Sequence, residues 1–204
     1  MEKGDTKGRI LAQAVRLFAV LGYEAVTVET IADAVGIKAP SLYKHFKSKR
    51  DIFESILREM ERRDAENAAA SSVPGEPKEV DPAAYEHVSA DAFLDFCRVM
   101  FRHWTEDEFA ASFRRMLTVE QYRDRAMNDL YHQYLGAGPL RYTADVLGSE
   151  EMALSLYGPM HLLYGVYDSA GDKEAVSAML EAHLRQWRTA WMKKGENKNE
   201  LSAE

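Results

Sequence analysis

The segment that decides the fold is "TVETIADAVGIKAPSLYKHF", Thr27–Phe46. It holds two short helix-forming stretches separated by Gly36, which permits the positive φ that a sharp turn often needs. Thr27 is a good N-cap for the first stretch, and Pro40 fits the first position of the second, where no N–H is needed. The pattern predicts a helix-turn-helix whose second helix presents its N-terminus and one face outward.

A preceding amphipathic helix is predicted over residues 6–21. Ile10, Ala14 and Phe18 form an i, i+4, i+8 stripe, and Gly22 ends the helix. This stripe can pack against apolar side chains of the helix-turn-helix, which are Ile31, Ala32, Val35, Ile37 and Leu42. We therefore expect a three-helix head.

The remaining chain is also predicted to be helical, because no sustained period-2 pattern with hairpin signals occurs. A helix capped by Ser48 follows the head, and the turn-rich segment 71–89 is predicted to be a connector. Thr105 is the expected cap of the helix over 106–120, and the tail after residue 193 is expected to fray. The fold class is all-α with about nine helices, the later ones over residues 90–104, 106–120, 123–135, 150–167 and 173–193, with a short piece over 140–147.

Composition restricts the class of protein. The chain has 204 residues, 46% of them hydrophobic, and a net charge of −7. Residues 1–62 carry eleven basic and nine acidic side chains, so the acidic excess lies in the rest of the chain. No apolar run approaches the roughly 20 residues that span a bilayer, and no secretory signal is seen. The single cysteine, Cys97, is read as a buried hydrophobe and fits a reducing cytoplasm.

The N-terminal quarter of the chain resembles a known family. The stretches "AVRLFAVLGYEAVTVETIADAVGI" (14–37) and "PSLYKHFKSK" (40–49) resemble the DNA-binding domain of the TetR family of bacterial transcription regulators. The resemblance covers residues 6–57. It implies a DNA-binding domain over residues 1–48 and a helical ligand-binding and dimerisation domain over 49–204, in a cytoplasmic homodimer that binds a palindromic operator.

The resemblance also assigns roles within the head. Thr27 and Lys49 would hold phosphates, and Lys38 would read a base or hold a phosphate. Tyr43 would contact the groove and the backbone, although it can also be a packing residue. The full set of expected DNA-binding residues is Thr27, Lys38, Ala39, Pro40, Ser41, Tyr43, Lys44, His45 and Lys49.

The later helices carry large adaptable side chains that can pack in a core or line an apolar pocket with polar tips. The expected ligand-binding residues are Met100, Trp104, Phe113, Met116, Tyr131, Tyr134, Tyr157, His161 and Tyr164. His103, His132 and His161 do not share a metal-ligand spacing, so no metal site and no cofactor are predicted.

Two apolar stripes near the C-terminus are predicted to form a four-helix dimer seam, with burial inside the subunit as the alternative. The residues expected at the seam are Met152, Leu156, Leu163, Leu180, Leu184, Trp187 and Trp191.

Together these patterns predict a dimeric, sequence-specific DNA-binding regulator, a repressor released by a small molecule. An activator, or a regulator without a ligand, remains open. The alternative from another class is a small-molecule-binding helical protein whose N-terminal head is an assembly module. No catalysis is predicted, because no phosphate-binding glycine loop, metal-spaced cluster or nucleophile–base pattern is seen.

Overall fold

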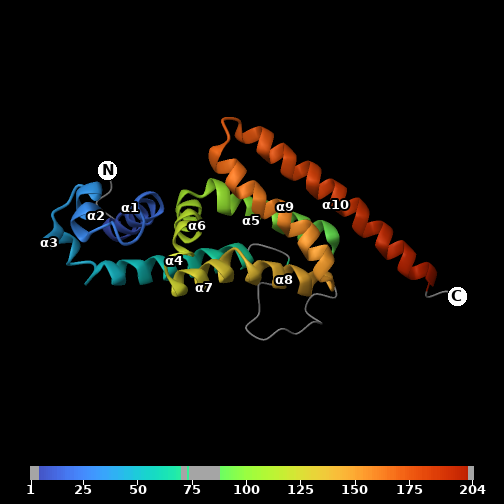
Figure 1. The fold of residues 1–204 in the computed structure, drawn as a ribbon, viewed down its shortest axis with the longest axis horizontal. Coiled ribbons are helices and arrows are strands. Elements are labelled where there is room, and N and C mark those ends of the chain that lie inside the picture. The colour runs from blue at the N-terminus through green and yellow to red at the C-terminus, as the bar shows by residue number, and fades with distance from the viewer. Residues whose placement is uncertain (1–4, 70–72, 74–87, 202–204) are drawn as a thin grey trace. The chain divides into compact units, whose positions relative to one another are not determined.

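The structure, a computed structural model, describes residues 5–69, 73 and 88–201. These residues form ten α-helices and no strand, which confirms the all-α fold (Figure 1). The predicted connector over 71–89 lies almost wholly outside the described residues. The helices are α1 Thr6–Leu21, α2 Val28–Val35, α3 Ala39–Leu42, α4 Lys49–Ala69, α5 Ala90–Glu106, α6 Glu108–Glu120, α7 Arg125–Tyr134, α8 Ala137–Leu147, α9 Glu150–Ser169 and α10 Lys173–Leu201.

The helices gather into two compact units. The head unit comprises Met1–Asn67 and Glu106–Tyr134, and the body unit comprises Ala68–Thr105 and Leu135–Glu204. By packing, α6 and α7 therefore belong with the helix-turn-helix, although they follow it by 40 residues or more in sequence. The boundary predicted after residue 48 separates a DNA-binding from a ligand-binding function, which packing does not test, so it stays a prediction.

The head forms as its local signals predict. The Thr27 side chain accepts a hydrogen bond from the Thr30 amide at 3.2 Å, and Gly36 is left-handed with φ 76°. The core of the head contains Phe18, Leu42 and Phe46, all almost fully buried. Burial of α1 against α2 and the turn thus fixes which face of the helix-turn-helix points outward.

One predicted cap is wrong. Asp107, and not Thr105, caps α6, because its carboxylate accepts hydrogen bonds from the amides of Phe109 and Ala110 at 2.9 Å each. Thr105 lies inside α5 and its hydroxyl donates to the Phe101 carbonyl at 2.6 Å. A threonine that can bond back to a carbonyl four residues earlier need not end its helix.

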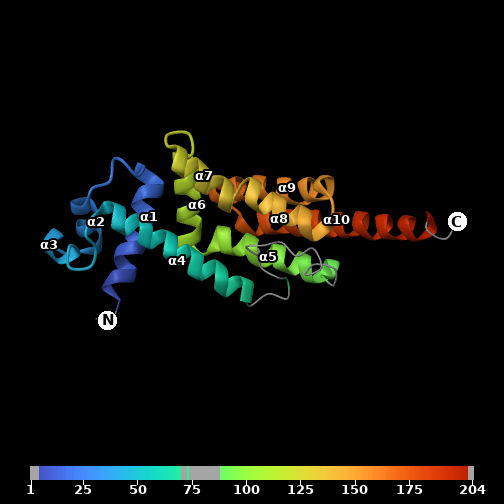
Figure 2. The ribbon, with the colours of Figure 1, turned by 90° about the horizontal axis from the view of Figure 1, so that it is seen from below.

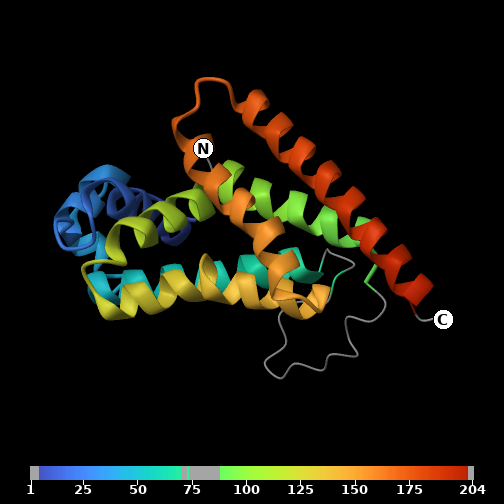
Figure 3. The ribbon, with the colours of Figure 1, turned by 45° about the vertical axis from the view of Figure 1, so that its right-hand side comes forward.

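The body unit contains α5, α8, α9 and α10, with α9 packed against both α8 and α10 (Figures 2 and 3). Ion pairs join α5 to α10, from Arg98 to Glu181 at 2.9 Å and from Arg188 to Asp91 at 2.6 Å. Helix α10 continues to Leu201, so the helix end predicted at residue 193 is wrong, while the predicted fraying of the tail stays a prediction. The tail contains Lys and Glu, which are good helix formers and can extend a helix that is packed along its first half.

Candidate nucleic-acid interface

The candidate interface is the turn from Lys38 to Phe46. Leu42 and Phe46 anchor it in the head core, and Lys38, Pro40 and Tyr43 lie between and beside them on the surface. Tyr43 is half exposed, which fits both a contact with DNA and the alternative of a packing residue with a solvated hydroxyl. The anchored leucine and phenylalanine therefore present an aromatic and a basic side chain to solvent.

The recognition segment is shorter than predicted. Helix α3 ends at Leu42 and not at Phe46. The chain then tightens, since the Lys44 amide bonds the Ser41 carbonyl at 3.3 Å and the His45 amide bonds the Leu42 carbonyl at 2.8 Å. These i→i−3 bonds are typical of the last turn of a helix, so the backbone keeps turning in the helical sense through His45.

Positive charge at this turn is unneutralised. Within the described residues, no carboxylate pairs with the side-chain ammonium group of Lys38, Lys44 or Lys47, although the Lys47 backbone N–H donates to Asp51 Oδ2 at 2.8 Å. Arg50 differs, because its guanidinium donates to Glu54 at 2.9 Å, and this hydrogen bond raises the pKa of Arg50. The three lysines can thus attract a polyanion within the Debye length, which is about 10 Å at 0.1 M ionic strength.

Thr27 and Lys49 are the expected phosphate contacts outside the turn Lys38–Phe46. Thr27 is exposed at the N-terminus of α2, where backbone N–H groups favour an anion. Lys49 is already engaged: its Nζ donates to the Tyr23 carbonyl at 2.8 Å and the Glu24 carbonyl at 3.3 Å, and lies 4.4 Å from the Tyr23 ring centroid. An ammonium has three N–H bonds, so at most one remains for the predicted phosphate contact.

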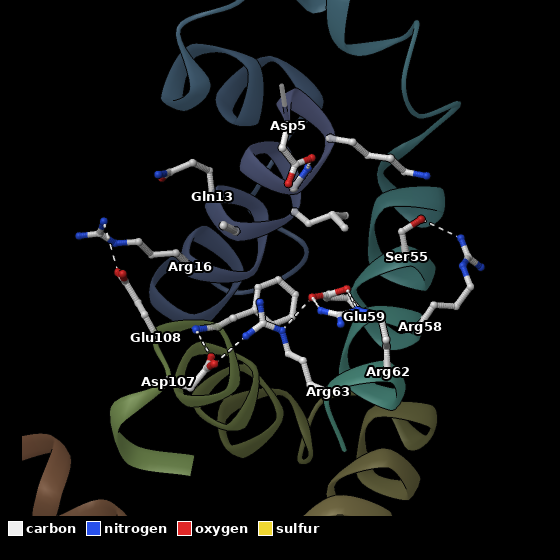
Figure 4. A pocket seen from close by; sticks show the side chains of 15 residues that line it. Asp5, Gln13, Arg16, Ser55, Arg58, Glu59, Arg62, Arg63, Asp107 and Glu108 are labelled. Atoms are coloured by element: carbon white, nitrogen blue, oxygen red, sulfur yellow. Dashed lines mark hydrogen bonds and ion pairs between the residues drawn. The ribbon is translucent and has the colours of Figure 1, made fainter. Parts of the chain in front are cut away.

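A polar groove of about 810 Å³ lies elsewhere in the head unit, between α1, α4 and the start of α6 (Figure 4). Arg63 crosses it, with Nη1 2.6 Å from an Asp107 oxygen and Nε 2.8 Å from a Glu59 oxygen. Hydrogen bonds from Arg62 and Arg63 lower the pKa of Glu59. The ion pair between Arg63 of α4 and Asp107, the cap of α6, crosses this groove and fastens α4 to α6.

The expected ligand-binding residues fall into both units. In the head unit, the rings of Phe113 and Tyr134 meet edge to face with centroids 5.1 Å apart. In the body unit, the His161 ring lies 5.9 Å from the rings of both Tyr157 and Tyr164. Of the whole set, Phe113, Met116, Tyr131 and Tyr134 belong to the head unit, and Met100, Trp104, Tyr157, His161 and Tyr164 belong to the body unit.

The polar atoms of these side chains have defined environments. The Tyr157 hydroxyl donates to the Leu135 carbonyl at 2.8 Å. Burial raises the pKa of Tyr134, and the nearby Asp64 and Glu61 carboxylates raise it further. The Tyr134 hydroxyl therefore stays protonated near pH 7 and can donate or accept a hydrogen bond.

The residues expected at the dimer seam lie largely inside the body unit. Leu156, Leu180 and Leu184 are buried, and the Trp187 indole N–H donates to Ser155 at 3.1 Å. The stripes pack α9 against α10, so the alternative of burial within the subunit describes these residues. The buried members are Leu156, Leu163, Leu180, Leu184 and Trp187, while Met152 and Trp191 are half-buried.

A different apolar stripe is exposed. Leu154, Leu162 and Val166 recur along α9, and Met179 is exposed on α10. Gly165 precedes Val166 in α9, and a Cβ built on this glycine would meet no atom within 4 Å, so the backbone is open to solvent there. The α9 stripe has the same helical period as the buried one, so its spacing could have been found in the sequence but its exposure could not.

Two absences concern the described residues only. Within the ranges 5–69 and 88–201, no three His, Cys, Asp or Glu side chains are arranged to hold a metal ion. In the same ranges no helix combines the length and apolarity that crossing a membrane requires.

Comparison with known proteins identifies the N-terminal segment. Residues 10–56 match the family profile of bacterial regulatory proteins, tetR family. The HTH-type transcriptional repressor KstR2 of Mycolicibacterium smegmatis is 45% identical over 58 residues, 28% of each chain. The biofilm operon icaADBC HTH-type negative transcriptional regulator IcaR of Staphylococcus aureus is 42% identical over 52 residues, 26% of this chain and 28% of that protein. The matched segment thus spans under a third of either relative.

The fold match extends further than the sequence match. The fatty acid degradation regulator FadR from Bacillus halodurans superposes with a TM-score of 0.61 over 92% of this chain and 96% of that one, at 14% identity. At this identity the likeness concerns the fold alone. Residues 10–56 are thus similar to the bacterial regulatory proteins of the tetR family, and the similarity in sequence is confined to this N-terminal segment.

Proposed function

We propose that the protein is a homodimeric, sequence-specific DNA-binding repressor of transcription that a small molecule releases from its operator. The observation that carries the proposal is the turn Lys38–Phe46, which is anchored by two buried apolar residues and leaves unpaired lysines and Tyr43 exposed. Its family match over residues 10–56 supports the same role. The protein acts in the cytoplasm, where its DNA is, and the proposal includes no catalytic step.

The first turn of α3 supplies sequence readout. Lys38 can donate to guanine O6 and N7, and the side-chain carbons of Ala39 and Pro40 can contact a thymine methyl group. Tyr43, Lys44 and His45 then contact phosphates, which fix the position of the head but specify no base. Thr27 adds a phosphate contact from the N-terminus of α2.

A dimer supplies the second head. We place its seam on the exposed stripe Leu154, Leu162 and Val166 of α9, together with Met179 of α10. Burying an exposed leucine side chain contributes about 1.5–3 kcal/mol, so a two-fold symmetric seam of such residues supports stable association. Two heads then read half-sites about 34–36 Å apart, one turn of B-DNA.

Release requires a ligand with different affinity for the DNA-bound and free states. We place that ligand near the aromatic side chains of the predicted set, where Tyr157, His161 and Tyr164 share one face of α9. Tyrosine hydroxyls and an imidazole would orient a mostly apolar molecule.

Selection of bound duplexes from a random pool tests the proposal. We expect enrichment of a palindrome by the wild-type protein and its release by a fraction of a metabolite extract. A promoter–reporter assay with the enriched site should show repression. Recovery of no common sequence, at a salt concentration where the protein is folded, would refute sequence-specific binding.

A further inference from the structure

Glu120, the last residue of α6, is a carboxylate buried in the head unit. Its side chain is 4% exposed, and its Oε1 accepts hydrogen bonds from the Tyr23 backbone N–H and from Arg123 Nη1, both at 3.1 Å. A buried carboxylate is unfavourable unless it is paired and hydrogen-bonded. The position of Glu120 is therefore fixed by the Tyr23 amide on one side and Arg123 on the other.

Tyr23 belongs to the loop that leads into the candidate interface. The loop connects α1 to α2 and ends at Thr27, the cap of α2 and an expected phosphate contact. The Tyr23 ring packs on Phe18 of α1 and Phe53 of α4, with centroids 5.0 and 5.4 Å away. Lys49 of α4 holds the Tyr23 carbonyl at 2.8 Å. From α6, the Glu120 side chain holds this loop by a hydrogen bond to the Tyr23 amide.

The carboxylate also lies directly against the loop backbone. Gly22 has φ 84°, and a Cβ built on it would lie 2.9 Å from Glu120 Oε1 and 2.9 Å from Arg123 Nη1. A side chain at position 22 would therefore require Glu120 or Arg123 to shift. A displacement of this end of α6 therefore displaces Gly22 and Tyr23 as well.

The other end of α6 is fastened to α4. Arg63 pairs with Asp107, the cap of α6, at 2.6 Å, and its guanidinium lies 4.7 Å from the Phe109 ring centroid (Figure 4). A cation over an aromatic face adds to the ion pair. Helix α6 is thus held at both ends by parts of the head unit, with Glu120 at the end that faces the loop.

We infer that Glu120 is a positioning residue for DNA binding, which acts through the Tyr23 amide to set the place of Thr27. The inference rests on the DNA-binding function proposed above and names a route by which that function is set. The effect on the loop passes through one acceptor oxygen, so the reach of that oxygen decides the contact with the Tyr23 amide. A neutral acceptor of the same length can still accept from this amide and from Arg123.

Three substitutions at Glu120 separate reach from charge. Glu120→Met keeps the length of the side chain and removes the acceptor, and Glu120→Asp keeps the charge but is one methylene too short. Glu120→Gln keeps both the length and an acceptor oxygen. The matched control is Glu108→Gln on the same helix, whose side chain is 78% exposed.

Binding of each variant to the enriched duplex is measured by fluorescence anisotropy over a range of salt. Thr27 would contact phosphate through neutral groups, the hydroxyl and the N–H groups of α2, whereas counterion release follows from phosphates neutralised by Lys or Arg. Loss of the Thr27 contact in both subunits should therefore weaken binding without changing the slope of log K against log salt. We expect at least tenfold weaker binding at 0.1 M salt, with a wild-type slope, for Met and Asp. We expect wild-type affinity for Gln and for the control. The folded fraction of each variant, measured by circular dichroism, shows whether weaker binding comes from unfolding.

Hydrogen exchange of the Tyr23 amide gives a readout that does not need DNA. Protection should fall in the Met and Asp variants and persist in the Gln variant. Wild-type affinity and protection in Met and Asp, or a Gln variant as impaired as Met, would overturn the inference. Failure of the wild-type protein to bind any duplex would instead count against the proposed function, while the exchange result would still decide whether Glu120 holds the loop.

Discussion

Replacing Gly22 with alanine perturbs the junction between α1, α2 and α6. Gly22 has φ 84° and ψ 152°, a conformation that is essentially restricted to glycine and costs another residue about 1–3 kcal/mol. The new Cβ would also meet Glu120 Oε1 and Arg123 Nη1 at 2.9 Å. Arg123 is exposed and can move, but Glu120 is buried, so its displacement leaves the Tyr23 amide unpaired at a cost of about 1–3 kcal/mol.

The two contributions together predict that Gly22→Ala lowers the free energy of unfolding by about 2–6 kcal/mol. The matched control is Gly36→Ala in the same head, where φ is 76° and nothing lies within 4 Å of the new Cβ. Its expected loss is the left-handed strain alone, about 1–2 kcal/mol. Urea denaturation followed by circular dichroism measures both variants. Equal losses in the two variants would refute the claim that Glu120 is packed against the loop.

Three further predictions concern the body unit. Leu162→Glu, on a side chain that is 67% exposed, should leave the protein folded but monomeric in light scattering, whereas Leu156→Glu should unfold it; the reverse pattern would move the seam back to the buried stripe. Burial raises the pKa of Cys97 to about 12, so iodoacetamide at pH 8 should label this thiol only after denaturation, and rapid labelling of the folded protein would contradict its burial. A hydrogen bond from Arg98 lowers the pKa of Glu181 below 4.5, so its stabilisation is present above that pH and is lost as the pH falls; Glu181→Gln should flatten the loss of stability below pH 4.5, and an unchanged profile would argue against the pair.

The head could be predicted from sequence because its signals are local. Thr27 and Gly36 fix the ends of α2 through bonds to neighbours three or four residues away, and Gly22 ends α1 in the same way. The recognition turn follows from these ends and from two apolar anchors. Such features depend on short-range chemistry that a sequence displays directly.

Contacts between distant residues could not be predicted in this way. Glu120 and Tyr23 are 97 residues apart, and nothing in either neighbourhood marks the other as its partner. The stripe containing Leu156 was correctly read as apolar, but periodicity does not say whether a stripe faces its own chain or a second copy. Thr105 and Asp107 are both good N-cap residues, and the Thr105 hydroxyl bonds back to the Phe101 carbonyl while the Asp107 carboxylate accepts from the Phe109 amide, a choice that the residue types alone do not settle.

The most direct test of DNA binding by the recognition turn is the dissociation constant of the enriched palindrome for the wild type, Tyr43→Ala and Tyr122→Ala. Tyr122 is the control, because it is an exposed tyrosine, 86% exposed, that lies just after α6 and outside the recognition turn. A hydrogen bond to a charged phosphate contributes about 1.5–3 kcal/mol, and a dimer loses two, so Tyr43→Ala should weaken binding by about 100-fold or more. Tyr122→Ala should bind as the wild type does. Unchanged affinity of Tyr43→Ala at moderate salt, or equal losses in both variants, would contradict the account.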